Sequence, residues 1–217
     1  MPKLIVNIYM KIIVTILLII LTSLTMVSQN FEGKISYNNA YKSKKWILSD
    51  EKLNSLMGTK QDFFVKGGDY KSITNGTFQW TAFVNKDNKI YTKILDNETI
   101  YWNDALTQES TIIKVELHKD AIEILGYKCD EIILTTKDGT SKYYFNIATA
   151  ADFKLYEKHK FGNWYEYLKM ANAWPLKIVI DNDKFSLISI ATEVKEMKLD
   201  GKAFIIPTNA KIKKNPF

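Results

Sequence analysis

The segment Tyr70–Val84, which reads YKSITNGTFQWTAFV, decides the fold of this chain. Asn75-Gly76 separates two runs rich in β-branched and aromatic residues, and this dipeptide favours a tight hairpin because both central residues of the turn take positive φ. In the second run, Phe78, Trp80 and Val84 alternate with other residues, as expected for a strand with one buried face. The segment therefore predicts an antiparallel hairpin.

The same pattern extends from this hairpin toward both ends of the chain. Short runs rich in Ile, Val, Thr, Tyr, Phe and Trp alternate with turns that contain Gly, Asn or Asp, which is typical of antiparallel strands. The predicted strands are Phe31–Tyr37, Asp62–Lys66, Tyr70–Thr74, Thr77–Val84, Ile90–Leu95, Thr99–Trp102, Thr111–His118, Tyr127–Thr136, Thr140–Asn146, Leu176–Ile180, Phe185–Val194 and Ala203–Ile206. Pro207 closes the last run, because proline is tolerated at a strand end.

Helical periodicity occurs in two places. Asp50–Met57 follows Ser49, a favourable N-cap, and ends before Gly58, a favourable helix end. Within Asn163–Ala171, four apolar side chains share one helix face, namely Trp164, Tyr167, Leu168 and Ala171. Two short helices cannot cover both faces of a sheet of about ten strands, and a twisted sheet of that size does not stay flat. We therefore expect a mainly β fold, a curved antiparallel sheet that forms an unclosed half-barrel with a helical lid.

The N-terminal residues predict export from the cytoplasm. Ile12–Val27 carries no charge, follows Lys11 and precedes a polar Ser-Gln-Asn stretch. This stretch is shorter than the roughly 20 residues of a membrane span and has the profile of a signal peptide. The sequence thus predicts a signal peptide over residues 1–28, a single β-rich domain over 29–217, and a periplasmic or secreted protein with no stable transmembrane span after cleavage. A retained N-terminal anchor is the alternative.

Composition narrows the classes of function. The chain is 46% hydrophobic and 25% charged, as in globular proteins. It has a formal charge of +6, yet all its basic residues are lysines and none is arginine. Arginine is the usual residue for bidentate recognition of phosphate and guanine, so we expect no nucleic-acid partner. Two histidines and one cysteine are too few for a zinc or iron–sulfur site, so we expect no metal and no cofactor.

The few reactive residues have structural interpretations. Cys129 lacks a histidine base in any recognisable pattern, so we expect a small, buried core residue. We expect His118, on the polar face of its strand, and His159, in a lysine-rich stretch, to be surface residues. The sequence contains no nucleophile elbow, phosphate loop or dinucleotide fingerprint. It therefore predicts no catalytic residue and no enzyme, with a hydrolase whose site is unrecognised as the minority alternative.

One segment carries a resemblance to a known family. Ile122–Ile132 reads IEILGYKCDEI, and a Lys-Asp-Gly turn follows at 137–139. This resembles the Gly-Tyr-Lys-Cys signature of a family of secreted bacterial envelope proteins of unknown function, which looks related to the lipoprotein carrier LolA and its relatives LolB and LppX. Further matches in the same order are Phe31–Ile35, Pro175–Ile178, Ala191–Val194 and Phe204–Pro207. Together the motifs span residue 31 to about 210.

The resemblance implies an unclosed antiparallel barrel with a helical lid over a cavity that accepts acyl chains. In carriers of that type a cavity arginine helps to control ligand release, and this chain has no arginine. The chain also lacks a cysteine at the end of its hydrophobic segment, which separates it from membrane-anchored receptors of the LolB type.

The alternating strands and the second helix supply the candidate ligand-binding residues. We expect one apolar cleft lined by Phe78, Trp80, Val84, Ile113, Val115 and Leu117, with Trp164 and Leu168 in the lid. Burial in such a cleft favours an apolar or acyl-bearing ligand, and lysines at its rim favour an anionic head group. The sequence therefore predicts a non-enzymatic binding or carrier-like protein for a hydrophobic, lipid or acyl ligand. The alternative is an interaction module that binds an envelope protein and no small ligand.

Overall fold

The computed structural model describes residues 30–45, 48–108 and 110–216, and the predicted signal peptide lies outside them. The strands are β1 Gly33–Ser43, β2 Lys60–Lys66, β3 Asp69–Thr74, β4 Phe78–Val84, β5 Lys89–Ile94, β6 Thr99–Asp104, β7 Ile112–Ile124, β8 Tyr127–Thr136, β9 Gly139–Ala150, β10 Ala173–Asn182, β11 Phe185–Glu196 and β12 Lys211–Lys214. The α-helices are α2 Asp50–Met57 and α3 Trp164–Ala171. Four short 3₁₀ helices complete the described elements, η1 Asn85–Asp87, η2 Phe153–Tyr156, η3 Phe161–Asn163 and η4 Gly201–Phe204.

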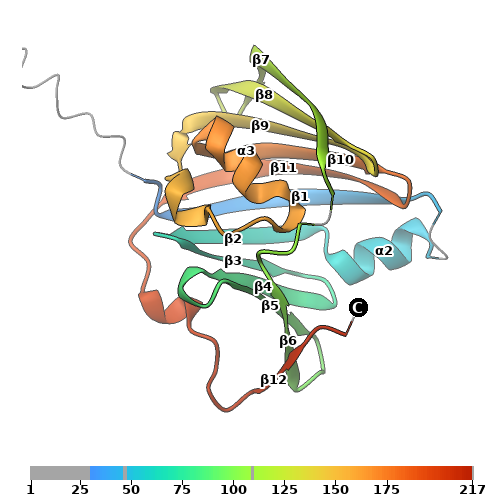
Figure 1. The fold of residues 1–217 in the computed structure, drawn as a ribbon, viewed down its shortest axis with the longest axis vertical. Coiled ribbons are helices and arrows are strands. Elements are labelled where there is room, and N and C mark those ends of the chain that lie inside the picture. The colour runs from blue at the N-terminus through green and yellow to red at the C-terminus, as the bar shows by residue number, and fades with distance from the viewer. Residues whose placement is uncertain (1–29, 46–47, 109, 217) are drawn as a thin grey trace, which may run out of the picture.

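The twelve described strands form one sheet in the order β12-β6-β5-β4-β3-β2-β1-β11-β10-β9-β8-β7 (Figure 1). From β1 in the middle, the chain runs outward through β2–β6, crosses to the far edge at β7, and returns through β8–β11. Neighbouring strands are antiparallel except β12 and β6, which are parallel. The edge strands β12 and β7 do not pair with each other. The sheet is therefore an unclosed half-barrel, which confirms the predicted fold class.

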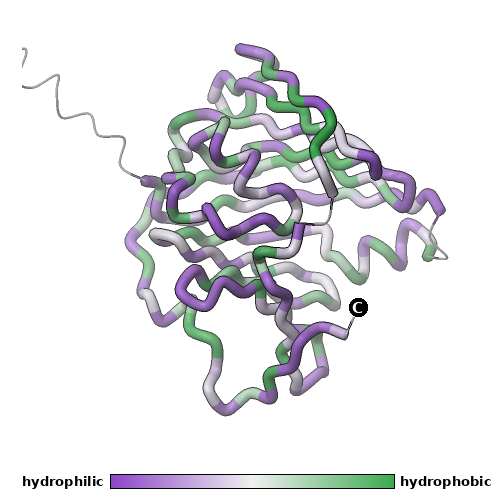
Figure 2. The backbone as a smooth tube through the Cα atoms, viewed as in Figure 1, coloured by the Kyte–Doolittle hydropathy of each residue, from purple (hydrophilic) through white to green (hydrophobic). Residues whose placement is uncertain are grey.

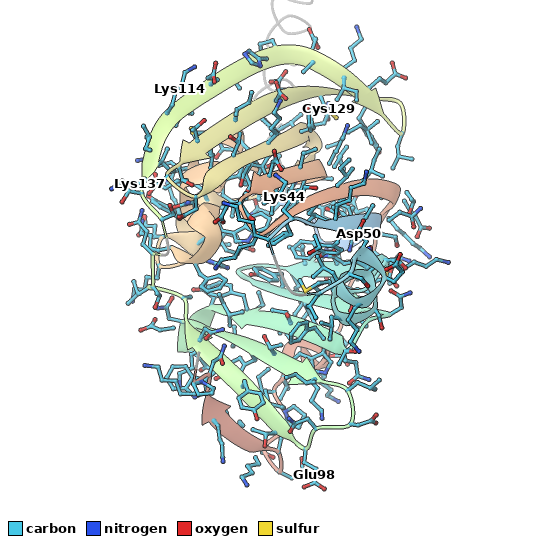
Figure 3. All side chains as sticks on the ribbon, turned by 90° about the vertical axis from the view of Figure 1, so that its right-hand side faces the viewer. Lys44, Asp50, Glu98, Lys114, Cys129 and Lys137 are labelled. Atoms are coloured by element: carbon cyan, nitrogen blue, oxygen red, sulfur yellow. The ribbon has the colours of Figure 1, made fainter. Side chains whose placement is uncertain are left out.

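The helical cover lies on one side of the curved sheet. Figure 1 shows α3 and the short helices before it in front of the strands β8–β11, and Figure 3 shows β7 arching over the top of the molecule. We call the face that α3 covers the inner face and the opposite face the outer face. Along the strands, hydrophobic and hydrophilic residues alternate (Figure 2), because successive side chains point to opposite faces.

Two hydrophobic clusters hold the sheet, one on each face. The main core lies on the inner face and includes Ile35 and Phe83 of the sheet and Tyr167 and Leu168 of α3. A smaller cluster lies on the outer face of β4–β6, where residues 205–216, here called the C-terminal segment, cover Val84, Tyr91 and Ile100. The C-terminal segment therefore acts as a second, non-helical cover for the part of the sheet farthest from α3.

Helix α2 begins and ends as its sequence predicts. The side-chain oxygen of Ser49 accepts a hydrogen bond from Lys52 N, and Gly58 follows the helix with a φ of 89°. Asn54 joins the helix to β1, because its side chain accepts from Tyr41 N at 3.0 Å and donates to Tyr41 O at 2.7 Å. The helix thereby takes the place of a neighbouring strand beyond the last residue that β2 pairs with on β1, Asn38.

The prediction of a last strand at Ala203–Ile206 is wrong. This stretch contains the 3₁₀ helix η4, which begins because the Asp200 side chain accepts a hydrogen bond from Lys202 N. Phe204 is buried there, and Lys71 Nζ donates to Ala203 O at 3.2 Å. The last strand is instead β12, four mostly charged residues that pair in parallel with the free edge of β6.

Candidate functional site

Aromatic side chains fill the inner face beneath α3. Tyr167 of α3 stacks on Tyr143 of β9 with ring centroids 4.3 Å apart. Trp174 meets the rings of Phe63 and Tyr156 edge-on, at centroid distances of 5.0 Å and 5.3 Å. Stacked and edge-to-face pairs at these distances are the favourable arrangements of aromatic rings. The space under the helical cover is therefore occupied by the protein's own side chains.

His159 belongs to this packing, so the prediction that it is a surface residue is wrong. Its Nε2 lies 2.8 Å from the Tyr70 hydroxyl, and its ring centroid lies 4.4 Å from that of Phe83. The turn after η2 holds it there, because His159 N donates to Tyr156 O at 2.8 Å. Burial lowers the pKa of His159 to about 4, so the imidazole is neutral at pH 7.

Helix α3 lies over the β8–β11 part of the sheet and not over β4–β6 (Figure 1). An apolar groove lies on the inner face of β4–β6. Its volume is about 470 Å³, within the range of small-molecule sites. The end of α2, three strands and the C-terminal segment line it with Met57, Phe78, Thr81, Thr92, Ile94, Tyr101, Asn215 and Pro216. The groove is thus a site of suitable size whose walls come from residues 57–101 and from the last described residues of the chain.

A β-bulge decides which aromatic side chain of β4 reaches the groove. Phe78 pairs with Ile94 and Trp80 pairs with Lys93, so the register shifts between these two pairs. A bulge adds one residue to one strand and thereby changes the alternation of side chains between the faces. Phe78 consequently shares the inner face with Ile94, whereas Trp80 lies on the outer face.

Trp80 and Val84 do not line an inner cleft, contrary to the prediction. Val84 belongs to the outer-face cluster, and Trp80 packs against it beneath the C-terminal segment. Lys71 Nζ lies 4.8 Å from the centre of the Trp80 ring. The alternation lies on the correct strand, but the face it marks is buried by a segment that no sequence pattern places there. Phe83, which lies between the alternating residues, is the one in the main core.

Ile113, Val115 and Leu117 lie on β7 at the open edge of the sheet (Lys114, between them, is labelled in Figure 3). Val115 pairs with Leu134, and Leu117 pairs with Ile132. Directly opposed residues share a face, so Val115 and Leu117 are on the inner face with those core residues. They nevertheless remain 45% and 54% exposed, and Ile113 is 63% exposed. They form an exposed apolar strip and not the wall of a cleft, because β7 extends beyond the cover of α3.

Helix α3 carries the two predicted lid residues, and both pack into the main core. Leu168 is fully buried. Trp164 is half-buried, with its ring centroid 5.8 Å from that of Trp174 and 6.0 Å from that of Tyr143. The helix therefore covers the sheet as predicted, but it covers packed rings. Of the eight residues predicted for one cleft, Phe78 alone lines the groove.

Sequence reasoning missed the other groove residues. Met57 lies in the predicted helix Asp50–Met57, and Ile94 lies in the predicted strand Ile90–Leu95. These patterns predicted the two elements, but they did not indicate that the two side chains line the same groove. Tyr101 lies in the next predicted strand. No pattern links Pro216 to these residues, since the parallel pairing of β12 with β6 joins segments that are far apart in sequence.

The groove lining combines apolar side chains with a row of hydroxyl groups. Thr81 pairs with Thr92 across β4 and β5, and Thr92 pairs with Tyr101 across β5 and β6. Within the described part of the chain, none of these three side-chain hydroxyls makes a hydrogen bond. No charged side chain is among the described lining residues. The groove therefore offers a guest apolar contact and a few hydrogen-bonding groups.

The other reactive residues lie away from the groove. Cys129 is buried, as predicted, and burial raises the pKa of its thiol to about 11, so it is protonated at neutral pH. His118 is exposed on β7, and its Nδ1 lies 2.6 Å from Glu131 Oε2. In the described residues, no group of three or more His, Cys, Asp or Glu side chains is arranged to hold a metal ion. No helix among these residues has both the length and the hydropathy needed to cross a bilayer.

Comparison with known proteins gives likeness in structure and none in sequence. No protein-family model matches this sequence, and no curated protein does. Among solved structures, an uncharacterized conserved protein from Thermus thermophilus is similar with a TM-score of 0.51 at 8% identity, over 87% of this chain and 94% of that chain. This likeness shows a shared fold and extends over nearly the whole of both chains.

Two further solved structures show weaker likeness. A structure of PNGF-II has a TM-score of 0.44 at 14% identity, and the match covers 84% of this chain but 31% of that chain. The lipoprotein LppX of Mycobacterium tuberculosis has a TM-score of 0.31 at 12% identity, over 76% of this chain and 90% of that chain. The half-barrel assignment rests on the topology of this chain itself.

Proposed function

We propose that this chain is a non-enzymatic binding or carrier-like protein that takes up a hydrophobic, acyl-bearing ligand in the groove on β4–β6. The observation that carries the proposal is a groove of about 470 Å³ with a mainly apolar lining, on a part of the inner face that the main core under α3 does not fill. The predicted signal peptide and the envelope-family resemblance support a periplasmic or secreted location. The buried thiol of Cys129 and the buried, neutral His159 support a role without catalysis.

Burial of methylene groups would provide most of the affinity. Each buried methylene contributes about 0.8 kcal/mol, so two more methylenes strengthen binding roughly tenfold until the groove is full. Phe78 and Ile94 lie opposite each other across β4 and β5 and supply the apolar floor. The hydroxyl row beside them limits how far an entirely apolar guest is favoured, because Thr81, Thr92 and Tyr101 need hydrogen-bond partners.

Displacement of a fluorescent fatty-acid probe from the purified protein tests this function. We expect saturable binding, and we expect Phe78→Ala to weaken it roughly tenfold through the loss of about 1–2 kcal/mol of apolar contact. Ile188→Ala is the matched control, since it truncates an exposed apolar side chain on β11, outside the groove. Absence of saturable uptake by the wild-type protein, or equal effects of the two substitutions, would overturn the proposal.

The open edge of β7 favours a second candidate function, an interaction module that pairs with another copy of this chain. Two antiparallel copies of β7 are related by a two-fold axis perpendicular to the sheet, and this rotation leaves each side chain on the same face. In any such pairing, inner-face residues of one copy therefore lie opposite inner-face residues of the other. The register centred on Val115 places Lys114 of each copy opposite Glu116 of the other. Exposed Val115 side chains then meet on the inner face. This register is complementary in both charge and hydropathy.

Analytical ultracentrifugation distinguishes the second candidate from the first. A self-pairing edge gives a concentration-dependent dimer that Val115→Lys abolishes, because two like charges then meet at the axis. Ile147→Lys on β9 is the control, since Ile147 is exposed on a strand that is not at an edge. A monomer at all concentrations would remove the candidate and leave the ligand-binding proposal untouched.

A further inference from the structure

Strand β12 borders the groove with alternating lysines. It pairs in parallel with β6, in the register Lys211↔Thr99 and Lys213↔Tyr101. Residues paired in this way share a face, and Tyr101 lines the groove, so Lys213 and Lys211 are on the groove side. The next residue, Lys214, is on the other side, where its Nζ lies 5.8 Å from the centre of the Trp102 ring.

The outer-face packing fixes this orientation independently. Ile212 pairs with Ile100, a buried member of the outer-face cluster, and Lys89 Nζ lies 4.1 Å from the Trp102 ring on that same side. Strand alternation then leaves the groove side to Lys211 and Lys213. Both side chains are exposed, and neither forms an ion pair with any residue in the described ranges.

The groove is therefore apolar along its floor and positive at one margin. Its described lining contains no acidic side chain that would neutralise the two lysines or repel an anion. Lysine ammonium groups attract anions as flexible point charges and do not demand one planar geometry. Beside them, the Tyr101 hydroxyl has no described partner and is able to donate a hydrogen bond to the same anion.

We propose that the ligand is an anionic amphiphile, with its acyl chain along Phe78 and Ile94 and its negative head group at Lys211 and Lys213. This inference rests on the proposed function of the groove and adds the class of ligand to it. The chemistry is shared by a free fatty acid, whose head is a carboxylate, and by a single-chain phospholipid, whose head is a phosphate. In both ligands the acyl chain matches the apolar floor of the groove, and the anionic head group matches the two lysines at its margin.

Matched ligands and matched variants test the head-group site. Binding of dodecanoate and of 1-dodecanol, which differ in charge at equal chain length, is measured on the wild type, on K211Q/K213Q and on K214Q. Loss of two exposed charge contacts weakens dodecanoate binding about three- to tenfold. We expect 1-dodecanol binding to stay unchanged in the double variant, and K214Q to bind both ligands as the wild type does, since Lys214 faces away from the groove.

Salt and a second head group sharpen the result. Raising the NaCl concentration from about 50 to about 500 mM weakens dodecanoate binding and leaves 1-dodecanol binding unaffected, because exposed charge pairs are screened. Lysophosphatidylglycerol competes with dodecanoate if the lysines accept a phosphate head group. Whichever of these two ligands binds more tightly identifies the preferred head group.

The outcomes separate the two proposals. If neither dodecanoate nor 1-dodecanol binds the wild type, the proposed function itself fails. If both bind equally and K211Q/K213Q leaves both unchanged, the hydrophobic site stands and the anionic head-group site is overturned. Equal weakening of both ligands in the double variant also overturns it, since the lysines would then act on the shape of the groove and not through charge.

Discussion

The two parts of the inner face solve the same packing problem differently. Beneath α3, rings from the sheet and the helix fill the concave side, with Trp174 and Tyr167 fully buried. On β4–β6, the neighbouring chain is the end of α2 and the C-terminal segment, and a groove remains between them. Helix α3 lies across the strands and brings large side chains onto the concave face of the sheet. The end of α2 and the C-terminal segment reach only the margins of that face.

The difference also separates stability from function. A packed interior loses several kcal/mol when a large side chain is truncated, and it has no room for a guest. A groove lined by half-buried side chains contributes less to folding and keeps apolar surface available for binding. The part under α3 therefore holds the fold together, and the groove beside α2 and β12 is the proposed ligand site.

Truncating one side chain in each part gives the largest expected contrast. Leu168→Ala removes a fully buried core side chain and lowers the free energy of unfolding by about 2–5 kcal/mol. Phe78→Ala removes a half-buried groove residue and costs about 1 kcal/mol. Urea unfolding at pH 7 measures both. Similar losses for the two variants would show that the groove is as tightly packed as the core.

The packed part also contains a pH-sensitive group. The pKa of His159 is about 4 in the folded protein and 6.5 when unperturbed, so below pH 6.5 the unfolded chain binds a proton that the folded protein does not. Stability is therefore fully present above pH 6.5 and falls by roughly 3 kcal/mol as the pH drops toward 4.

Urea unfolding between pH 4 and 7 measures this dependence against two variants. We expect His159→Gln to lose the part of the slope that lies between pH 4 and 6.5. His118→Gln serves as the control, because that side chain is half exposed on the edge strand β7. An unchanged slope in His159→Gln would mean that the imidazole already titrates normally in the folded protein.

Thiol accessibility provides the smallest but most direct contrast. Cys129 is buried and its thiol pKa is raised to about 11, so a water-soluble alkylating reagent reacts with it slowly in the native protein at pH 7.5. A thiol introduced as Thr92→Cys in a Cys129→Ala background lies in the groove and reacts roughly two orders of magnitude faster. We also expect dodecanoate to slow the alkylation of the thiol at position 92. Equal alkylation rates at positions 92 and 129 would contradict the contrast between an open groove and a packed core.

Much of the fold could be predicted because local rules and tertiary packing agree. Ser49 and Gly58 bound α2 as expected, and the stripe that includes Tyr167 and Leu168 does face the core. The curvature followed from the number of strands and the shortage of helices. The strand β12 could not be predicted, because Lys-Ile-Lys-Lys has no apolar run and its pairing depends on an edge supplied by distant residues.

The site was harder to predict because a single bulge changes the face of a side chain. Alternation placed Phe78 and Trp80 together, but the register shift between them puts one in the groove and the other on the outer face. For Val115, alternation gave a face shared with Leu117, yet it carried no information on how far the cover of α3 extends. Alternation reports which side chains point the same way, and not what lies above them.

The central position of β1 has a consequence for the order in which the chain acquires its structure. β1 pairs with β2, which follows soon after it, and also with β11, where Gly33 meets Glu196. A polypeptide that emerges N-terminus first can assemble β1–β6 while one side of β1 still lacks its partner. That unfinished side persists until residues near 196 have been delivered, since joining such distant segments is the slow step of a non-local topology. Synthesis from the N-terminus therefore leaves the β1–β6 half of the sheet with an unpaired strand edge until residues near 196 have emerged.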